Sequence, residues 1–141
     1  SPGIAYGFDV GCPALLVWDP DGGKHTANYI DNLDWKSKIT KAGEAAVNRL
    51  RQYNWDHNIW ETLLEEADNF ALESGLLEEK ERAKLLNLVL ENSDDTMSCH
   101  LCMLGTSMIV LPKKLGSEID FGELSSNLTS LGLGVRETIL Q

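Results

Sequence analysis

Residues 99–102, with the sequence Cys-His-Leu-Cys, have the clearest chemical potential in this chain. Two thiols at this spacing can bind one metal ion or form a redox pair if a turn brings both sulfurs to one side. A structural zinc site needs about four ligands, which usually include a second closely spaced pair. The remaining candidate ligands, Cys12, His25, His57 and His100, are scattered along the chain without the spacing of a second pair. We therefore expect no metal and no disulfide here, and cysteines that fill the core as small apolar side chains.

No motif in the sequence identifies a catalytic residue. The three histidines are isolated from one another, and no Ser or Cys lies in a Gly-x-Ser-x-Gly pattern. The Gly-Leu-Gly of residues 132–134 lacks the strand and helix context of a phosphate-binding loop. We therefore predict no cofactor and no catalytic residue, and favour a non-enzymatic protein. The alternative is a small enzyme or ligand-binding domain whose cleft collects scattered residues, such as His25, His57, Cys99 and acids.

Acidic residues dominate the middle of the chain. The formal net charge is −10, and twelve acids and three bases lie between Asn54 and Asp95. The acids are Asp56, Glu61, Glu65, Glu66, Asp68, Glu73, Glu78, Glu79, Glu81, Glu91, Asp94 and Asp95, and the bases are Lys80, Arg82 and Lys84. Binding to nucleic acid or to anionic lipid depends on Lys and Arg, so this charge argues against both kinds of partner. The remaining interpretations are a solvated outer face and a surface that binds a basic protein.

Both interpretations of the charge stay open, and for the chain as a whole we favour a protein-interaction or regulatory module, such as an inhibitor or immunity-type protein with a basic partner. Tryptophan anchors often dominate interfaces, and two tryptophans lie near the start of the acidic segment. The predicted partner-binding residues are Trp55, Trp60, Glu65, Glu66, Glu78 and Glu79. Changing these four glutamates to Lys should weaken binding without disturbing the fold, because they lie off the apolar stripes.

The positions of these residues depend on elements that the spacing of apolar side chains predicts. From Ile4 to Val10, apolar residues alternate with small or polar ones, which indicates a half-buried strand with Phe8 inward and Asp9 facing water. A second apolar run, residues 13–18, precedes Asp-Pro-Asp-Gly-Gly, whose Pro and Gly suit a hairpin loop. The return strand would cover residues 24–30 and complete an antiparallel meander.

The apolar spacing then changes to three and four residues, which predicts three helices. The first should begin at Ser37 as its N-cap, and the second should be capped by Asp56 and end near Gly75. The third follows after a very short joint, so the second and third helices should be antiparallel neighbours. The side chains expected in the core from these two helices are Leu63, Phe70, Leu86 and Leu90.

The last part of the chain predicts a strand–helix–strand unit. Residues 93–105 form either a short helix or a loop, and residues 107–111 form a strand that ends at Pro112. Asp120 can cap the following helix, and residues 135–140 form a last strand, parallel to the first if the two are adjacent. The fold class is therefore α+β, with a small mixed or antiparallel sheet from the N-terminal hairpin strands and the C-terminal strand–helix–strand. This sheet packs against a central group of about three helices.

Length and composition fit one domain over residues 1–141, with 43% hydrophobic and 24% charged residues. No apolar run approaches the roughly 20 residues that span a bilayer, and no signal-peptide pattern is visible. Three cysteines cannot all pair within one chain, which favours a reducing compartment and a cytoplasmic protein. The chain starts with Ser and ends with Leu-Gln, as the products of viral 3C-like proteases do. A viral polyprotein-derived accessory protein is thus a further alternative, although simple trimming explains these ends equally well.

Overall fold

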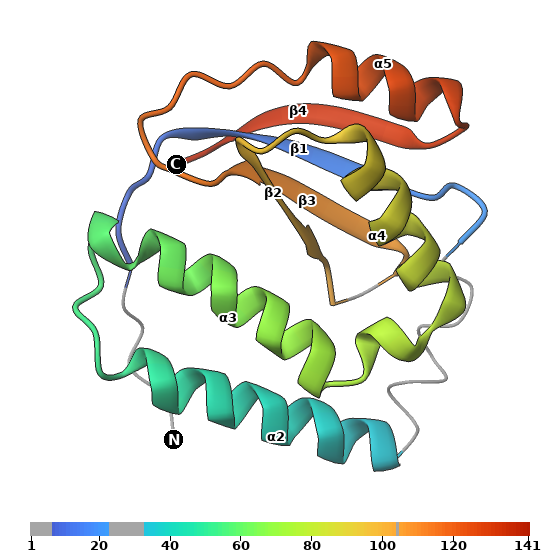
Figure 1. Cartoon of the computed structure of the whole chain (residues 1–141). Coiled ribbons are helices and arrows are strands. Elements are labelled where there is room, and N and C mark those ends of the chain that lie inside the picture. Colours follow the sequence, from blue (N-terminus) through green and yellow to red (C-terminus); the bar gives the residue numbers. More distant parts are fainter. Residues whose placement is uncertain (1–6, 23–32, 104) are drawn as a thin grey trace.

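The computed structural model describes residues 7–22, 33–103 and 105–141, and Figure 1 shows their arrangement. In chain order the elements are β1 (Cys12–Trp18), α2 (Leu33–Leu50), α3 (Trp60–Glu73), α4 (Lys80–Asn92), β2 (Met97–Leu101), β3 (Ser107–Pro112), α5 (Gly122–Ser130) and β4 (Gly134–Leu140). Short 3-10 turns, His57–Ile59 and Leu76–Glu78, lead into α3 and α4. Within these residues, no helix has the length and apolar character to cross a membrane. The predicted α+β class is confirmed.

The strands of the described residues form one antiparallel sheet in the order β2-β3-β1-β4. β1 lies between β3 and β4, with Leu15 opposite Val110 of β3 and opposite Glu137 of β4. Because β1 is antiparallel to both, β3 and β4 run parallel to each other, and α5 connects them. The predicted strands at residues 13–18, 107–111 and 135–140 are confirmed, but the last two are not adjacent.

Alternation along β1 separates two cores on opposite faces of the sheet. Leu15 and Val17 face α4 and α5, whereas Cys12 and Ala14 face α3. The first core comprises Leu15, Val17, Leu85, Val89, Met97, Cys99, Met108, Val110, Phe121, Leu124 and Leu128. The second comprises Cys12, Ala14, Trp60, Leu64 and Leu111. Because α2 packs on α3, the sheet lies between α4 with α5 on one side and the α2–α3 pair on the other (Figure 1).

The prediction that the second and third helices are antiparallel neighbours is wrong. Gly75 adopts the left-handed conformation expected at the end of α3, with φ of 83°. The chain does not fold back along α3, however, because the apolar side chains of α4, such as Leu85 and Val89, belong to the core on the other face of the sheet. The helix that packs on α3 is α2.

Two predictions about the helices need correction, and one is confirmed. Asp56 is a cap as predicted, since its carboxylate accepts the N–H of Asn58 at 2.9 Å. Ser37 is not an N-cap, because α2 already includes Leu33. The predicted core side chains Leu63, Phe70 and Leu86 are only partly buried, and Leu90 is half exposed. In α4 the fully buried side chains are Arg82, Leu85 and Val89, so the buried face of the helix is turned toward these positions and away from Leu90.

The predicted first strand is not formed where the structure describes it. Residues 7–10 do not belong to a strand, although the Val10 N–H donates to the Gln141 carbonyl at 3.1 Å. Phe8 and Val10 are partly buried against the α3-side core, and Asp9 is exposed. Gly11 has φ of 55°, a conformation that interrupts an extended strand, and β1 begins directly after it. Residues 4–6 and the return strand at residues 24–30 lie outside the described residues.

The helix or loop expected over residues 93–105 is replaced by strand β2 at residues 97–101. Asp94 accepts the N–H of Thr96 at 2.8 Å, so its side chain closes a turn before the strand and does not start a helix. Burial then alternates, because Met97 and Cys99 face the core shared with α4, whereas Ser98 and His100 face α3.

Candidate functional site

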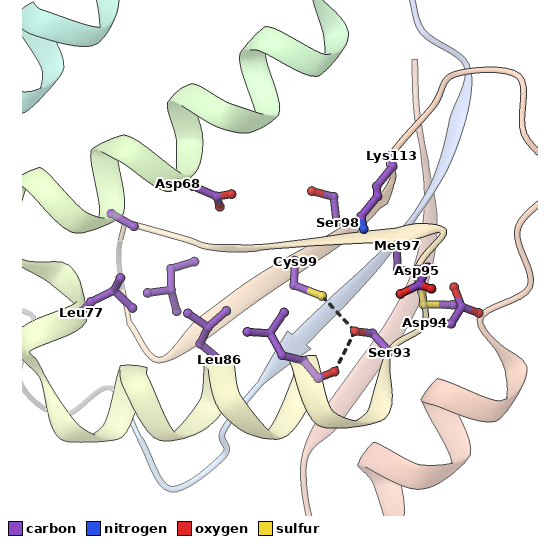
Figure 2. Close-up of a pocket in the computed structure, with 13 residues that line it drawn as sticks. Asp68, Leu77, Leu86, Ser93, Asp94, Asp95, Met97, Ser98, Cys99 and Lys113 are labelled. Atoms are coloured by element: carbon purple, nitrogen blue, oxygen red, sulfur yellow. Dashed lines mark hydrogen bonds between the residues drawn. The ribbon is translucent and has the colours of Figure 1, made fainter.

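The free edge of β2 lies along a cavity of about 440 Å³ between α3 and α4, which we call the β2 groove. β2 pairs with β3 on one side, and no strand of the described residues pairs with its other side. The residues that line the groove are Asp68, Ala71, Leu77, Leu86, Leu90, Ser93, Asp94, Asp95, Met97, Ser98, Cys99, Leu101 and Lys113. Figure 2 shows Asp68 and Ser98 on one side of β2, and Leu77, Leu86 and Cys99 on the other. The groove is therefore polar toward α3 and apolar toward α4.

Strand register shows which backbone groups of β2 face this groove. The N–H of Lys113 donates to the Thr96 carbonyl and that of Cys102 donates to the Ser107 carbonyl, both at 2.9 Å. Hydrogen-bonded pairs alternate along an antiparallel ladder, so Ser98 and His100 direct their peptide groups toward β3. The N–H and C=O of Cys99 and Leu101 consequently point the opposite way, into the groove.

Three polar side chains form a chain of contacts at the α3 side of the groove. Asp68 of α3 has a carboxylate oxygen 3.0 Å from Nδ1 of His100. On the other side of the ring, Nε2 of His100 is 2.6 Å from Oγ of Ser98. The His100 side chain is only 5% exposed, whereas that of Asp68 is 68% exposed. Nδ1 of His100 makes no well-aligned hydrogen bond, so its contact with the Asp68 carboxylate is electrostatic.

Burial lowers the pKa of His100 below its ordinary value of 6.5, although the nearby Asp68 carboxylate acts in the opposite direction. His100 is therefore neutral near pH 7. Because Asp68 can only accept, the ring proton belongs on Nδ1, and the unprotonated Nε2 accepts the hydroxyl proton of Ser98. This is the arrangement in which a histidine can take a proton from a serine.

The cysteines occupy separate positions. Cys99 faces α4, with its Sγ 3.7 Å from Oγ of Ser93, and burial raises the pKa of its thiol. Residues three apart in an extended chain lie on opposite sides, so Cys99 and Cys102 do not present two sulfurs to one ion. Cys12, Cys99 and Cys102 are all free thiols. Across residues 7–22, 33–103 and 105–141, no three His, Cys, Asp or Glu side chains form a group that could hold a metal.

The residues predicted to bind a partner are distributed over other parts of the molecule, and none lines the β2 groove. Trp60 is buried and donates its indole N–H to the Pro112 carbonyl at 2.9 Å. Trp55 is partly buried and lines a separate cavity near Tyr53. Partner binding by these two side chains stays a prediction.

The four predicted glutamates differ in their surroundings. Glu65 is exposed, whereas Glu66 is buried and accepts from Arg49 at 2.9 Å. Glu78 pairs with Lys38 at 3.3 Å, and Glu79 pairs with Arg82 at 3.4 Å. The premise that all four glutamates lie on a solvated face is contradicted for Glu66, which is buried beside Arg49, and for Glu79, which is 18% exposed beside Arg82. Lysine at either position would place a cation next to a buried or half-buried arginine, so the two substitutions should disturb the fold.

Sequence reasoning missed Asp68, Ser98 and His100 as a group. The alternation of Met97, Cys99 and Leu101 with polar residues was a usable strand signal, and it would have placed Ser98 and His100 on one face. No local pattern joins Asp68 to that face, because the contact depends on α3 packing across β2. His25 lies outside the described residues, and His57 is exposed, with its Nε2 2.8 Å from the Asp9 carbonyl.

We predict that His100 makes the protein less stable in mild acid. The folded pKa is below the unfolded value of about 6.5, so the unfolded chain binds the proton more readily. This contribution to stability is complete above pH 6.5 and is lost as the pH falls toward the folded pKa. Urea titrations between pH 7.5 and 5 should show this fall for the natural protein and for a His57→Gln control. The fall should be smaller in His100→Gln, and parallel curves for all three proteins would contradict the prediction.

The β2 groove thus combines an open strand edge, a buried histidine between a carboxylate and a serine, and an apolar wall. Comparison with known proteins gives no further guidance, since no family model, curated protein or solved structure matches this chain.

Proposed function

We propose that this chain is a protein-interaction module that binds an extended basic segment of a partner protein in the β2 groove. The observation that carries the proposal is the open edge of β2, at which Cys99 and Leu101 offer two N–H groups and two carbonyls. Proteins commonly pair such edges with an added strand, in which backbone hydrogen bonds give affinity and alternate side chains give specificity.

The sequence of β2 supports this use of its edge. Edge strands are usually protected from pairing by Lys, Pro, a bulge or a cover. β2, with the sequence Met-Ser-Cys-His-Leu, contains neither Lys nor Pro. The opposite edge strand, β4, instead presents Arg136 and Glu137 as exposed charges. Among the residues that the structure describes, β2 is thus the less protected edge of the sheet, and a groove runs along it.

The charges and the apolar wall of the groove favour a particular occupant. Asp68, Asp94 and Asp95 line the groove together with Lys113, the one cation among its described lining residues. Side chains of an added strand would alternate between the α3 side, with its carboxylate, and the α4 side, with its leucines. A segment of alternating basic and apolar residues fits both sides, and the net charge of −10 should attract it over a distance. The acidic interaction module favoured from the sequence is retained in this proposal, but its binding surface moves to the groove.

The test uses an eight-residue peptide of alternating Lys and Val, with fluorescence anisotropy as the readout. We expect this peptide to bind more tightly than the matching Glu-Val peptide, and its affinity to fall as the salt concentration is raised. Asp95→Lys should slow its association, whereas Glu123→Lys, at an exposed acid on α5, should not. If the Lys and Glu peptides bind equally, the groove does not select a basic segment.

N-methylation tests the strand geometry directly. An added strand directs alternate N–H groups toward β2, so methylating either all lysines or all valines should weaken binding by about tenfold. Methylating the other set should have little effect, because those N–H groups face solvent. Amide exchange should also slow at Cys99 and Leu101 of the protein. Equal affinity for both methylated peptides, with no change in exchange, would rule out strand addition.

A further inference from the structure

The contacts among Asp68, His100 and Ser98 carry an inference that does not depend on peptide binding. We propose that Ser98 is a nucleophile for acyl transfer, with His100 as its general base and Asp68 as the positioning residue for His100. The class of substrate is carboxylic esters with a short acyl group and a neutral or cationic alcohol portion.

Geometry supplies the main support. Ser98 Oγ is 2.6 Å from Nε2 of His100, and Nδ1 of the same ring is 3.0 Å from the Asp68 carboxylate. The order of groups is that of a catalytic triad, with a hydrogen bond between the base and the nucleophile and an electrostatic contact between the other ring nitrogen and the carboxylate. Ser98 lines the β2 groove, so its hydroxyl is next to a space that can hold a small ester.

The groove also offers a donor for the oxyanion that forms during acyl transfer. The N–H of Cys99, the residue after Ser98, points into the groove, as the strand register requires. A backbone N–H directly after the nucleophile is a common contributor to an oxyanion hole. Among the residues that line the groove, Lys113 is the cation that can add to this stabilisation. The acids Asp68, Asp94 and Asp95 would repel an anionic ester, which sets the substrate class.

The reaction balances with water as the second reactant. Ser98 Oγ forms a bond to the ester carbonyl carbon while its proton moves to Nε2 of His100, and the bond to the leaving alcohol breaks as that alcohol takes the proton. Water then attacks the acyl-Ser98 ester and gives its proton to His100. The carboxylic acid leaves as the proton returns to Ser98 Oγ.

The first experiment labels the intact natural protein with a fluorophosphonate and locates the adduct by peptide mass spectrometry. A serine–phosphorus bond forms and fluoride leaves, so no further reactant is needed. We expect the label on Ser98, and none on Ser98→Ala. The control is Ser126→Ala, at an exposed serine of α5 that does not line the groove, and it should leave the labelling of Ser98 unchanged. Absence of label on Ser98 of the folded natural protein would overturn the proposal.

The rate of p-nitrophenyl acetate hydrolysis, measured as a function of pH, tests whether His100 and Asp68 have the proposed roles. His100→Gln should lower the rate by about 100-fold or more. In the natural protein the rate should rise as His100 loses its proton, at a pH below 6.5. Asp68 of α3 is the charged group that acts on this ring, and the residue opposite His100 on β3 is the apolar Ile109.

The Asp68→Asn variant tests whether Asp68 acts on the ring of His100, because a purely structural role would leave the midpoint of the pH–rate profile unchanged. Loss of the carboxylate removes the contribution that raises the pKa of His100, so the midpoint of the pH–rate profile should shift to lower pH. A slower rate with an unchanged midpoint would show that Asp68 does not act through His100. Urea titrations of each variant confirm that the fold persists.

Discussion

Replacing Arg82 by Met should lower the free energy of unfolding by about 3–5 kcal/mol, because it breaks a buried ion pair on one side only. The Arg82 side chain is 2% exposed. Its Nη1 donates to the carbonyls of Cys102 and Met103 at 3.1 and 3.0 Å, and its Nε is 3.4 Å from the Glu79 carboxylate. The variant would leave a largely buried carboxylate without its cation and two carbonyls without their donor. Urea denaturation of the two proteins measures the difference.

The control for Arg82→Met is Lys84→Met, which removes an exposed cation from the same helix. Lys84→Met should change stability by less than about 0.5 kcal/mol. Adding Glu79→Gln to Arg82→Met should restore part of the loss, because the uncompensated charge disappears. If Arg82→Met and Lys84→Met are equally stable, the contacts of Arg82 with residues 102 and 103 do not contribute to holding α4 against the segment that follows β2.

Arg82 also links the fold to the site. It joins α4 to residues 102 and 103, directly after the strand whose free edge lies along the groove. The wall of the groove that contains Leu86 and Leu90 belongs to the same helix. Arg82 therefore helps to set the distance between this wall and β2, and the variant should weaken peptide binding as well as stability.

Local signals in the sequence were sufficient for several elements. The apolar run before the Asp-Pro-Asp-Gly turn forms β1, and residues 107–111 lie in β3. Asp56 and Gly75 mark the start and the end of the second predicted helix. In each case a side chain or a glycine acts within a few residues of the boundary that it determines. β2 was missed because Asp94 and Asp95 resemble a helix start, and because polar residues on its α3 face make the strand signal weak.

Long-range packing accounts for the errors at the site. The spacing of residues 99–102 suggests chemistry at its two cysteines, whereas the residue of this motif that contacts polar side chains at the groove is His100. Its importance depends on α3 lying over β2, which no local pattern predicts. The fully buried Arg82 was likewise unforeseen, since charged residues are rarely buried without a partner, and its carbonyl partners lie in another part of the chain.

The second large effect is expected at Leu85, where substitution by Ala should lower the free energy of unfolding by about 2–5 kcal/mol. Leu85 is 2% exposed and lies in the core between the sheet, α4 and α5, so its loss leaves a cavity. Leu90, which the spacing of apolar residues placed in the core, is 50% exposed. The same substitution there should lower stability by less than about 1 kcal/mol. Urea denaturation of the two variants compares the two positions on one helix.

Leu90 is nevertheless a wall residue of the β2 groove, so its truncation should act on binding. We expect Leu90→Ala to lower the affinity for the Lys-Val peptide. The substitution removes part of the apolar wall at the place where an added strand would put its valines. Leu72→Ala is the matched control, since Leu72 is an exposed leucine of α3 that does not line the groove. It should alter neither stability nor peptide affinity. If Leu90→Ala destabilises the fold as much as Leu85→Ala and leaves binding unchanged, then Leu90 is a core residue and the apolar wall of the groove has been misassigned.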